Sequence, residues 1–235
     1  MKLLAIETAT DTCSIALQLD GRRSALTEHL PRRQTERVLP MVDEILNQAG
    51  IALSSLDAIA FSQGPGAFTG VRVAVSIAQG LAFAVDVPLI GISTLACTAQ
   101  AAAMTHGPGA WFVAQDARMA EVYIAGYNVS ETESEPECLL NDMLCAPDAL
   151  PAEFAASLSG APAGLNWRGV GSGEMYLEQI RQQCSALGEW IGDIGPSAEA
   201  MLPLAVSAWS RGEVVAAELA QPVYLRNQVV QGAIR

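Results

Sequence analysis

The segment Gly64-Pro65-Gly66-Ala67-Phe68-Thr69-Gly70-Val71-Arg72 combines residue types that can hold an anion. It lies between a predicted buried strand and a predicted helix, where free backbone N–H groups and the helix dipole favour a phosphate. The only lysine of the chain is Lys2, so this loop lacks the lysine that neutralises a terminal phosphate in a Walker loop. Two interpretations stay open: a weak phosphate contact, or a glycine-rich turn needed for positive φ and close packing.

A second candidate is the segment Glu7-Thr8-Ala9-Thr10, which resembles the Asp-x-Gly-Thr hairpin of actin-like kinases. In that hairpin the aspartate orients a magnesium ion, and the glycine lets backbone N–H groups approach a phosphate. Glu7 is longer than aspartate and Ala9 replaces the glycine, so we expect at most a weak nucleotide site, with ATP bound at about millimolar affinity. The candidate residues of this site are Glu7, Thr10, Gly64, Gly66 and Thr69.

Metal-binding and nucleophilic chemistry have little support in the other polar residues. The two histidines, His29 and His106, are too far apart to form a metal-binding pair on one helix, so we expect no metal site. The five cysteines include no C-x-x-C pair, and no G-x-S-x-G sequence marks a serine nucleophile. Asp116 and Arg118 have two open interpretations: charged groups that face a cleft between lobes, or a surface ion pair of little energetic weight.

The composition predicts a large core and a surface that repels nucleic acid. Apolar residues make up 51% of the chain and charged residues 16%, an excess that suggests a surface buried against a partner. The net charge of -12 repels phosphate backbones, although five arginines between residues 22 and 37 form either a solvated face or a docking patch. Polar residues and Pro88 interrupt the most apolar stretch, 71–92, and we see no signal-peptide pattern, so we expect a cytoplasmic protein without a membrane span.

Hydrophobic periodicity predicts the elements that position these residues. Alternating or continuous apolar residues predict strands, and apolar residues three and four apart predict helices. Gly50 is expected to end the first helix, Ser93 to cap the third, and Pro40 to be tolerated near a first turn. The predicted strands are 2–7, 13–19, 22–29, 58–62, 88–92, 111–116 and 121–128, and the clearest helices are 35–49, 69–85, a helix after Ser93 and 197–211.

The order strand, strand, strand, helix, strand, helix, strand, helix resembles the ribonuclease H-like half of actin-type ATPases and sugar kinases. This resemblance implies an α/β, actin-like ATPase fold with two lobes and mixed sheets. We place the lobe boundary at the Gly-Pro-Gly break that follows His106, which gives domains 1–106 and 107–235. The last helix, about 197–211, is expected to pack back on the first lobe.

Five segments together resemble the TsaB (YeaZ) family along nearly the whole chain. They are LLAIETAT, QTERVLPMVDEIL, FSQGPGAFTGVRVAVSIAQGLAF followed by PLIGISTL, DARMAEVY and PVYLR, of which GPGAFTGVR is the most specific. The related TsaD proteins bind metal through an H-x-x-x-H pair, whereas Gln34 and Glu36 occupy that neighbourhood here. Gln34 also stands where TsaB relatives commonly have a histidine.

The resemblance implies a non-catalytic scaffold of the complex that makes threonylcarbamoyladenosine next to the tRNA anticodon. Its expected partners are TsaD, as a direct heterodimer, and the ATPase TsaE, with tRNA reached only through the complex. It implies no intrinsic cofactor and leaves open ATP or ADP at the interface of the complex, and a homodimer when the chain is alone. The alternatives are an actin-like metal-dependent peptidase, a small-molecule kinase, or a self-associating scaffold unrelated to tRNA.

The helix predicted at 69–85 is apolar all round, which suggests a second burying surface. We predict that its small residues form a stripe open to a partner helix, while Val73, Ile77 and Leu81 cover the sheet. The resemblance implies that TsaB and TsaD relatives join through their first two helices. The predicted interface is Val38, Val42, Ile45, Leu46, Gly70, Ala74, Ala78 and Ala82. The alternative is that the stripe packs inside its own domain.

Overall fold

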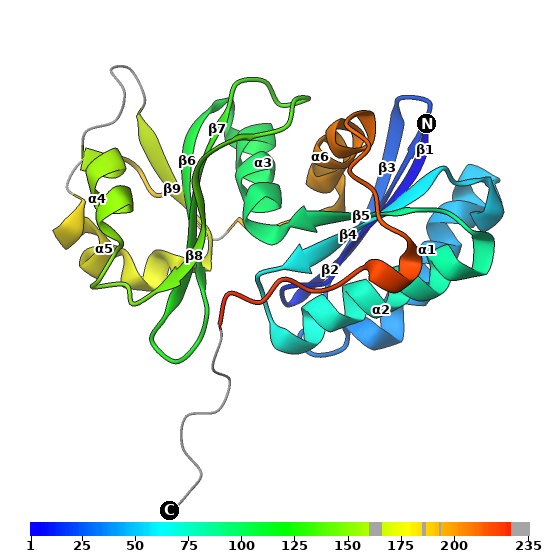
Figure 1. The fold of residues 1–235 in the computed structure, drawn as a ribbon, viewed down its shortest axis with the longest axis horizontal. Helices are drawn as coiled ribbons and strands as arrows, with labels where there is room; N and C mark the ends of the chain where they lie inside the picture. Colours follow the sequence, from blue (N-terminus) through cyan, green and yellow to red (C-terminus); the bar gives the residue numbers. More distant parts are fainter. Residues whose placement is uncertain (160–165, 185–186, 193, 227–235) are drawn as a thin grey trace, which may run out of the picture.

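The computed structural model describes residues 1–159, 166–184, 187–192 and 194–226, which fold into two mixed β-sheets with helices between and outside them (Figure 1). The strands are β1 (Lys2–Glu7), β2 (Thr12–Leu19), β3 (Arg22–His29), β4 (Ala58–Gly64), β5 (Leu89–Ser93), β6 (Gly109–Asp116), β7 (Val122–Val129), β8 (Glu137–Cys145) and β9 (Trp167–Val170). The helices are α1 (Gln34–Ala49), α2 (Phe68–Val85), α3 (Thr94–His106), α4 (Ala152–Ser159), α5 (Leu177–Gln183) and α6 (Ala198–Ser210), with short turns η1 (Leu53–Ser55), η2 (Ser172–Tyr176) and η3 (Ala217–Leu219).

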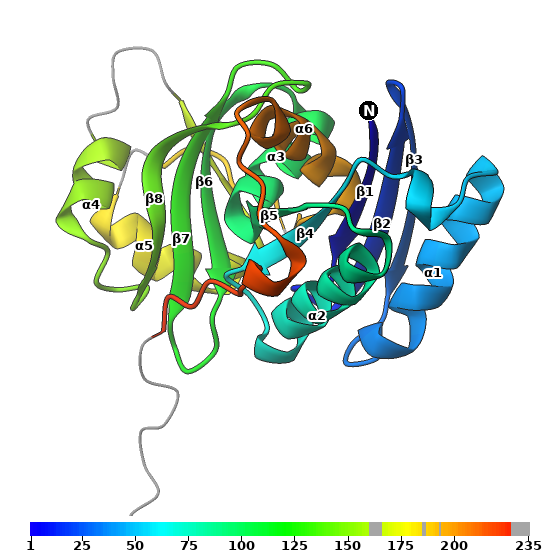
Figure 2. The same cartoon turned by 45° about the vertical axis from the view of Figure 1, so that its right-hand side comes forward.

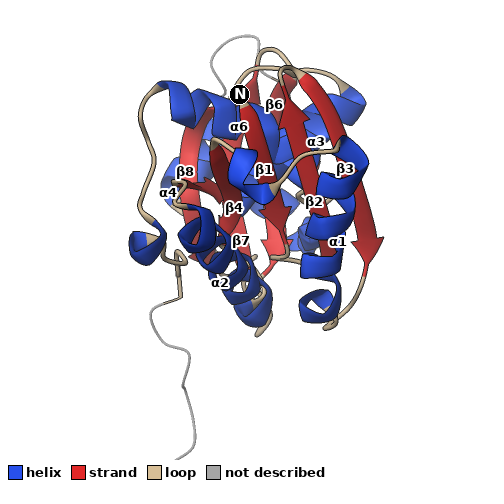
Figure 3. Ribbon diagram, turned by 90° about the vertical axis from the view of Figure 1, so that its right-hand side faces the viewer, coloured by secondary structure: helices blue, strands red, loops and turns tan. Residues whose placement is uncertain are grey.

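The first sheet has the strand order β3-β2-β1-β4-β5, in which β1, β4 and β5 are parallel and β2 and β3 are antiparallel neighbours. Alternate residues of β1 point to opposite faces, so that Leu4 and Ile6 meet α1 and α2, whereas Leu3 and Ala5 meet α3 and α6. Both faces are therefore buried, as expected for the parallel part of a sheet. Figure 3 shows α1 and α2 in front of the sheet. This is the ribonuclease H-like arrangement of an actin-like fold, and the prediction is confirmed.

The second sheet has the order β8-β7-β6-β9 and lies on the other side of α3 (Figure 2). Trp111 and Val113 of β6 pack toward α3, whereas Phe112 faces Phe154 of α4 and Ile180 of α5. The helix α3 thus forms a layer shared by the two sheets. It is rich in alanine, and its small side chains allow both sheets to approach it closely.

The helix α6 lies far along the chain but packs on the first sheet, beside α3, against β1, β2 and β5. The backbone N–H of Ala198 donates to Ser14 Oγ of β2 at 3.0 Å. At the C-terminal end of α3, Arg168 of β9 donates to the carbonyl oxygens of His106, Gly107 and Pro108 at 2.8 Å each. The connection between the two lobes is therefore fixed from the second sheet. We retain the boundary after residue 106 as a proposal.

Three local expectations need correction. Pro40 does not lie near the first turn of its helix, because α1 begins at Gln34 and the proline stands well inside it. The strand predicted at 58–62 continues to Gly64, and α2 begins at Phe68, one residue before the predicted Thr69. Two expected capping residues are confirmed: Gly50 closes α1 with φ 67°, and Ser93 Oγ, at the start of α3, accepts from the N–H groups of Leu95 and Ala96.

The helix α2 also corrects the expectation that no stretch is apolar enough to span a membrane. By length and composition alone Phe68–Val85 qualifies, because Asp86 and Pro88 lie beyond its end and Arg72 is its only charged residue. The helix packs on β4, α1 and η3 of the first lobe. These contacts bury one side of the helix within the lobe.

Candidate functional site

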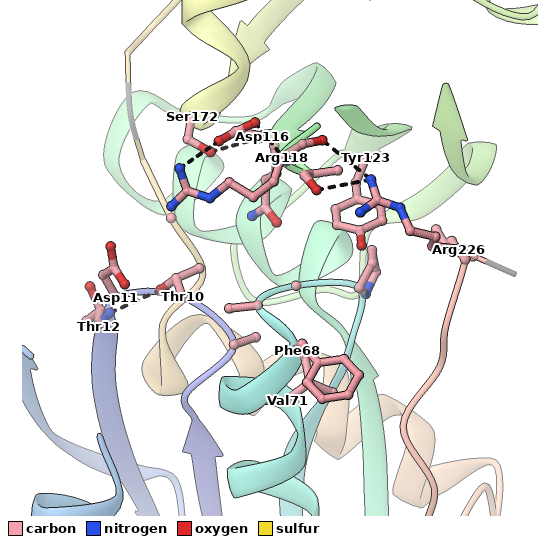
Figure 4. Close-up of a pocket in the computed structure, with 18 of the residues that line it drawn as sticks. Thr10, Asp11, Thr12, Phe68, Val71, Asp116, Arg118, Tyr123, Ser172 and Arg226 are labelled. Carbon is pink, nitrogen blue, oxygen red and sulfur yellow. Dashed lines mark hydrogen bonds and ion pairs between the residues drawn. The ribbon is translucent and has the colours of Figure 1, made fainter. Parts of the chain in front are cut away.

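A cavity of about 860 Å³ lies between the two lobes, and elements from the whole length of the chain surround it. Figure 4 shows Thr10, Asp11 and Thr12 on one side of it and Asp116, Arg118 and Ser172 on the other. Its volume falls in the range of small-molecule sites. The residues that line it come from the β1–β2 hairpin (9–12), His29, the β4–α2 turn and the start of α2 (65–68 and 71), the β6–β7 hairpin (115–119 and 123), the 172–175 turn, residues 194–195 and the segment 223–226.

On the side of the first lobe, the β4–α2 turn presses directly on the β1–β2 hairpin. The N–H of Ala67 donates to the Ala9 carbonyl at 2.8 Å. A side chain at Gly66 would place its Cβ 2.7 Å from the same carbonyl oxygen, so only glycine permits this approach. The space in which a phosphate would contact both loops is therefore largely occupied by the protein's own backbone. Of the predicted nucleotide residues, Thr10 and Gly66 line the cavity.

Glu7 does not line the cavity, in contrast to a magnesium-orienting carboxylate. Its side chain is fully buried, and its Oε1 accepts from the backbone N–H of Ala9 at 2.6 Å. The second oxygen, Oε2, has no hydrogen-bond partner among the residues that the structure describes. Burial raises the pKa of Glu7 to about 7, and the hydrogen bond from the Ala9 N–H only partly offsets this rise. The extra length of glutamate lets the carboxyl fold back on its own hairpin.

Gly64 and Thr69 also lie outside the cavity lining. Gly64 has φ 101°, and a Cβ there would lie 2.9 Å from the carbonyl oxygen of Val223, so its role is to admit a neighbouring segment. Thr69 is exposed in the first turn of α2. The structure thus brings together two of the five predicted residues and gives Gly64 the packing role that the sequence left open.

On the side of the second lobe, Asp116 organises the turn between β6 and β7. Its Oδ1 accepts from the backbone N–H of Arg118 at 2.9 Å and from the Tyr176 hydroxyl at 3.4 Å. Its own N–H donates to Ser172 Oγ at 3.0 Å. Its Oδ2 lies 3.1 Å from an Arg118 nitrogen. Both interpretations of this pair therefore apply: the two charges line the cavity and are also paired with each other.

The cavity is poorly suited to a triphosphate. Its two arginines are already engaged, Arg118 with Asp116 and Arg226 with Glu121. Asp11 adds a further negative charge to the lining. A polyphosphate entering this space would have to displace an ion pair or lie next to a carboxylate. These contacts support weak nucleotide binding at most.

No pattern in the sequence indicated the aromatic side of the cavity. The rings of Phe68 and Tyr224 lie 6.5 Å apart and nearly parallel, at 28°. The guanidinium carbon of Arg72 lies 3.3 Å from the Phe68 centroid and 4.8 Å from the Tyr224 centroid. The only available signal was the PVYLR segment, whose resemblance to the family marked Tyr224 and Arg226 without indicating their contacts. No local sequence pattern predicts a contact between two side chains that lie as far apart in the chain as Phe68 and Tyr224.

Other reactive groups are not arranged for chemistry. Across the described residues, no cluster of three or more His, Cys, Asp or Glu side chains could hold a metal ion. Burial raises the pKa of the Cys13 and Cys184 thiols to about 11, which keeps both protonated and weakly nucleophilic at neutral pH. His29 lines the cavity, whereas His106 ends α3.

The prediction for the two faces of α2 was wrong. The small residues Gly70, Ala74, Ala78 and Ala82 are buried against the first sheet and not open to a partner. The reason is close packing, since a Cβ on Gly70 would overlap the Thr8 carbonyl. Val73, Ile77 and Leu81, expected beneath the helix, are only partly buried.

The apolar residues of α1 belong to the same core. Val38, Val42, Ile45 and Leu46 are at most 7% exposed and pack with β1, β2 and α2. All eight predicted interface residues therefore support the fold of this chain. The exposed side of α2 carries a second series of small residues, Ser76, Gly80 and Ala84, next to Phe83, which is 80% exposed. On α1, Leu39 is 47% exposed.

Comparisons with known proteins agree along the whole chain. The family model of TsaD, tRNA N6-adenosine threonylcarbamoyltransferase, matches residues 28–150. The chain is 41% identical to the tRNA threonylcarbamoyladenosine biosynthesis protein TsaB of Escherichia coli over 97% of its length and 96% of the relative's. It is 36% identical to TsaB of Haemophilus influenzae, over 97% and 95%. A Pseudomonas aeruginosa crystal structure, described as similar to the peptidase YeaZ, superposes with a TM-score of 0.84 at 41% identity over 96% of this chain and 99% of that one.

Proposed function

This chain belongs to the TsaB (YeaZ) family of tRNA threonylcarbamoyladenosine biosynthesis proteins, and we propose that it binds and supports a TsaD-type transferase as a non-catalytic scaffold. TsaD is the proposed direct partner and TsaE the proposed ATPase of the same cytoplasmic complex. The chain supplies no transferase residues in this proposal. Its partner provides the reacting groups, and the chain provides a surface.

The observation that carries this proposal is the outer face of α2, defined here as Arg72, Val73, Ser76, Gly80, Phe83 and Ala84. Phe83 is 80% exposed at one end of this face. Ser76, Gly80 and Ala84 are also exposed, and their small side chains protrude little from the helix. Small residues four apart let a second helix approach closely, and a neighbouring aromatic side chain can anchor it. Leu39, on the neighbouring helix α1, is also exposed. We propose this face, in place of the buried stripe, as the docking surface for TsaD.

The charge of the chain supports an indirect role toward tRNA. With 25 acidic and 13 basic residues, the net charge of -12 opposes association with a phosphate backbone. Three of the five arginines between residues 22 and 37 pair with carboxylates: Arg23 with Glu133, Arg33 with Glu36 and Arg37 with Glu28. We propose that tRNA contacts the complex mainly through the partner.

We propose that the isolated chain has no intrinsic cofactor and no transferase or peptidase activity. The paired arginines of the cavity and the buried Glu7 support weak ATP binding. We assign any ATP or ADP of the complex to the interface between the two proteins. The metal-dependent peptidase alternative needs a cluster of metal-ligating side chains, and no group of three or more His, Cys, Asp or Glu side chains forms one among the described residues.

The proposal is tested by Ala84→Arg. Ala84 is exposed, so a long charged side chain leaves the fold intact but obstructs a helix docked on the outer face. We expect the affinity for a purified TsaD-type protein to fall about tenfold or more, measured by isothermal calorimetry. The matched control is Ala156→Arg, the same change at an exposed alanine of α4 in the second lobe.

The control variant should bind like the unchanged chain, and both variants should keep the unchanged circular dichroism spectrum. Equal affinity of Ala84→Arg and the unchanged chain would place the docking surface elsewhere. Failure of the unchanged chain to bind a TsaD-type protein at all would refute the scaffold role itself.

A further inference from the structure

The segment that follows η3 crosses from one lobe to the other along the side of the cavity. The residues directly before it, in and after η3, are attached to the first lobe, because Gln79 Nε2 of α2 donates to the carbonyl oxygens of Ala217 and Ala220 at 3.0 and 3.1 Å. Residues 221–226, here called the strap, continue from there toward β7 and β8 (Figures 1 and 2). Four of them, Val223 to Arg226, line the cavity.

The first half of the strap is attached to the first lobe. The N–H of Val223 donates to the Gln63 carbonyl at the end of β4, at 2.7 Å. The ring of Tyr224 stacks beside Phe68 at the start of α2, with Arg72 over Phe68 and close to both rings. Gly64 leaves room for the backbone of Val223, which a Cβ would obstruct. The strap is thus seated on the elements that form one wall of the cavity.

The second half is attached to the other lobe through a single side chain. Arg226 pairs with the Glu121 carboxylate and donates to the carbonyl oxygens of Ala117 and Arg118 at 3.2 and 3.4 Å. Its side chain is only 18% exposed, so water screens these contacts little. Charge-assisted hydrogen bonds of this kind are among the stronger ones.

The turn that Arg226 contacts has an unfavourable backbone. Arg118, Met119 and Ala120 have φ values of 64°, 57° and 57°, three successive residues with side chains in the left-handed region. The carbonyl groups of Ala117 and Arg118 open toward the Arg226 guanidinium in this conformation. The strap therefore stabilises the turn that forms the opposite wall of the cavity.

We propose that the strap is a latch that holds the two lobes closed around the cavity, and that release of Arg226 opens the cavity from this side. Within the described residues, Val223 N–H to Gln63 is the one backbone hydrogen bond that ties the strap to a strand or helix. A segment with so few backbone hydrogen bonds can detach without unfolding the sheets. The side-chain contacts at its two ends then decide whether the cavity is closed.

The test is hydrogen–deuterium exchange of the full chain carrying Arg226→Ala, followed by mass spectrometry. We expect about tenfold faster exchange in the turn 117–121, because the turn loses its contacts with the Arg226 side chain. We expect a similar increase at the Val223 amide, which is bonded to the other lobe through the Gln63 carbonyl. Peptides from β1 and α3 should exchange as before.

The same coupling should be visible from the other end. Tyr224→Ala removes the stack on Phe68, and we expect faster exchange in the turn 117–121, which Tyr224 does not anchor. The control is Arg211→Ala, which also breaks a contact between lobes, since Arg211 at the end of α6 pairs with Glu135 before β8. This variant should leave the exchange of the strap and the turn unchanged.

Three results would overturn the latch. Arg226→Ala could speed exchange only in the turn and leave Val223 protected, which would show two independent contacts. All peptides could exchange faster together, which would make the strap an ordinary part of the global fold. Arg211→Ala could open the cavity equally, which would assign closure to the interface between lobes as a whole.

Discussion

The two faces of α2 carry similar small residues at the same spacing for opposite reasons. On the inner face, Gly70 and Ala78 are small because the sheet and the β1–β2 hairpin lie directly against the helix. On the outer face, a Cβ added to Gly80 would meet no atom within 4 Å. Small side chains permit close approach in both cases, but only the inner approach is made within this chain. A spacing of four residues identifies a packing face without identifying what packs on it.

The largest expected effect comes from filling the inner face. Ala78→Phe adds a ring where the side chain is fully buried, so we expect the free energy of unfolding to fall by at least about 3 kcal/mol, or the protein not to fold. Urea unfolding followed by circular dichroism measures this change.

The matched control for that variant is Ser76→Phe on the outer face, where the position is exposed. Its free energy of unfolding should stay within about 0.5 kcal/mol of the unchanged chain. If both variants lost the same stability, the distinction between the faces would be wrong.

A slightly smaller effect concerns the hairpin against which the inner face packs. Burial raises the pKa of Glu7 from 4.5 to about 7 in the folded chain. Between these two values the unfolded chain loses its proton while the folded chain keeps it, so the contribution of Glu7 to stability is fully present below pH 4.5 and is lost as the pH rises through 7. The expected loss from this group is about 3 kcal/mol.

Glu7→Gln separates this contribution from those of other titrating groups. We compare the pH dependence of the unfolding free energy for the two proteins from pH 4.5 to 8. The difference between the two curves should change by the amount expected for Glu7 and level off as the pH approaches 8. A difference that stays constant with pH would show that Glu7 titrates normally in the fold.

The smallest expected effects are two changes of opposite sign in the free energy of unfolding. Gly80→Ala should raise the free energy of unfolding by about 0.5–1 kcal/mol, because alanine favours a helix interior and the site has room for a methyl group. Gly70→Ala should lower it by about 2 kcal/mol, because the same methyl group would overlap the Thr8 backbone. Thermal unfolding of both variants gives the two signs directly. Equal signs would contradict the assignment of the faces.

The fold was predictable because its signals are local. Apolar residues in β1 and β4, the spacing of Val38, Val42 and Ile45, the stop at Gly50 and the N-cap at Ser93 each act within a few residues. The inner and outer faces of α2 were not predictable in this way. Gly70 and Gly80 look equivalent in the sequence, and only contact with Thr8 in another element distinguishes them.

The cavity shows the same limit. Thr10 and Gly66 were recognised because each lies in a turn with a recognisable motif. Glu7 was misplaced because its side chain folds back on Ala9, which depends on burial that the sequence does not show. Arg226 reaches Glu121 across more than a hundred residues of chain, and no spacing rule relates them.

The position of α6 has a consequence for synthesis on the ribosome. All five strands of the first sheet have been made once residue 93 has been added, but one face of that sheet is completed by Ala198–Ser210. At the usual rates of translation, the intervening segment takes on the order of ten seconds to produce. During that interval Leu3 and Ala5 lack their native partners from α6. The N-terminal half therefore cannot finish folding first, and chaperones have a defined apolar face to protect until α6 arrives.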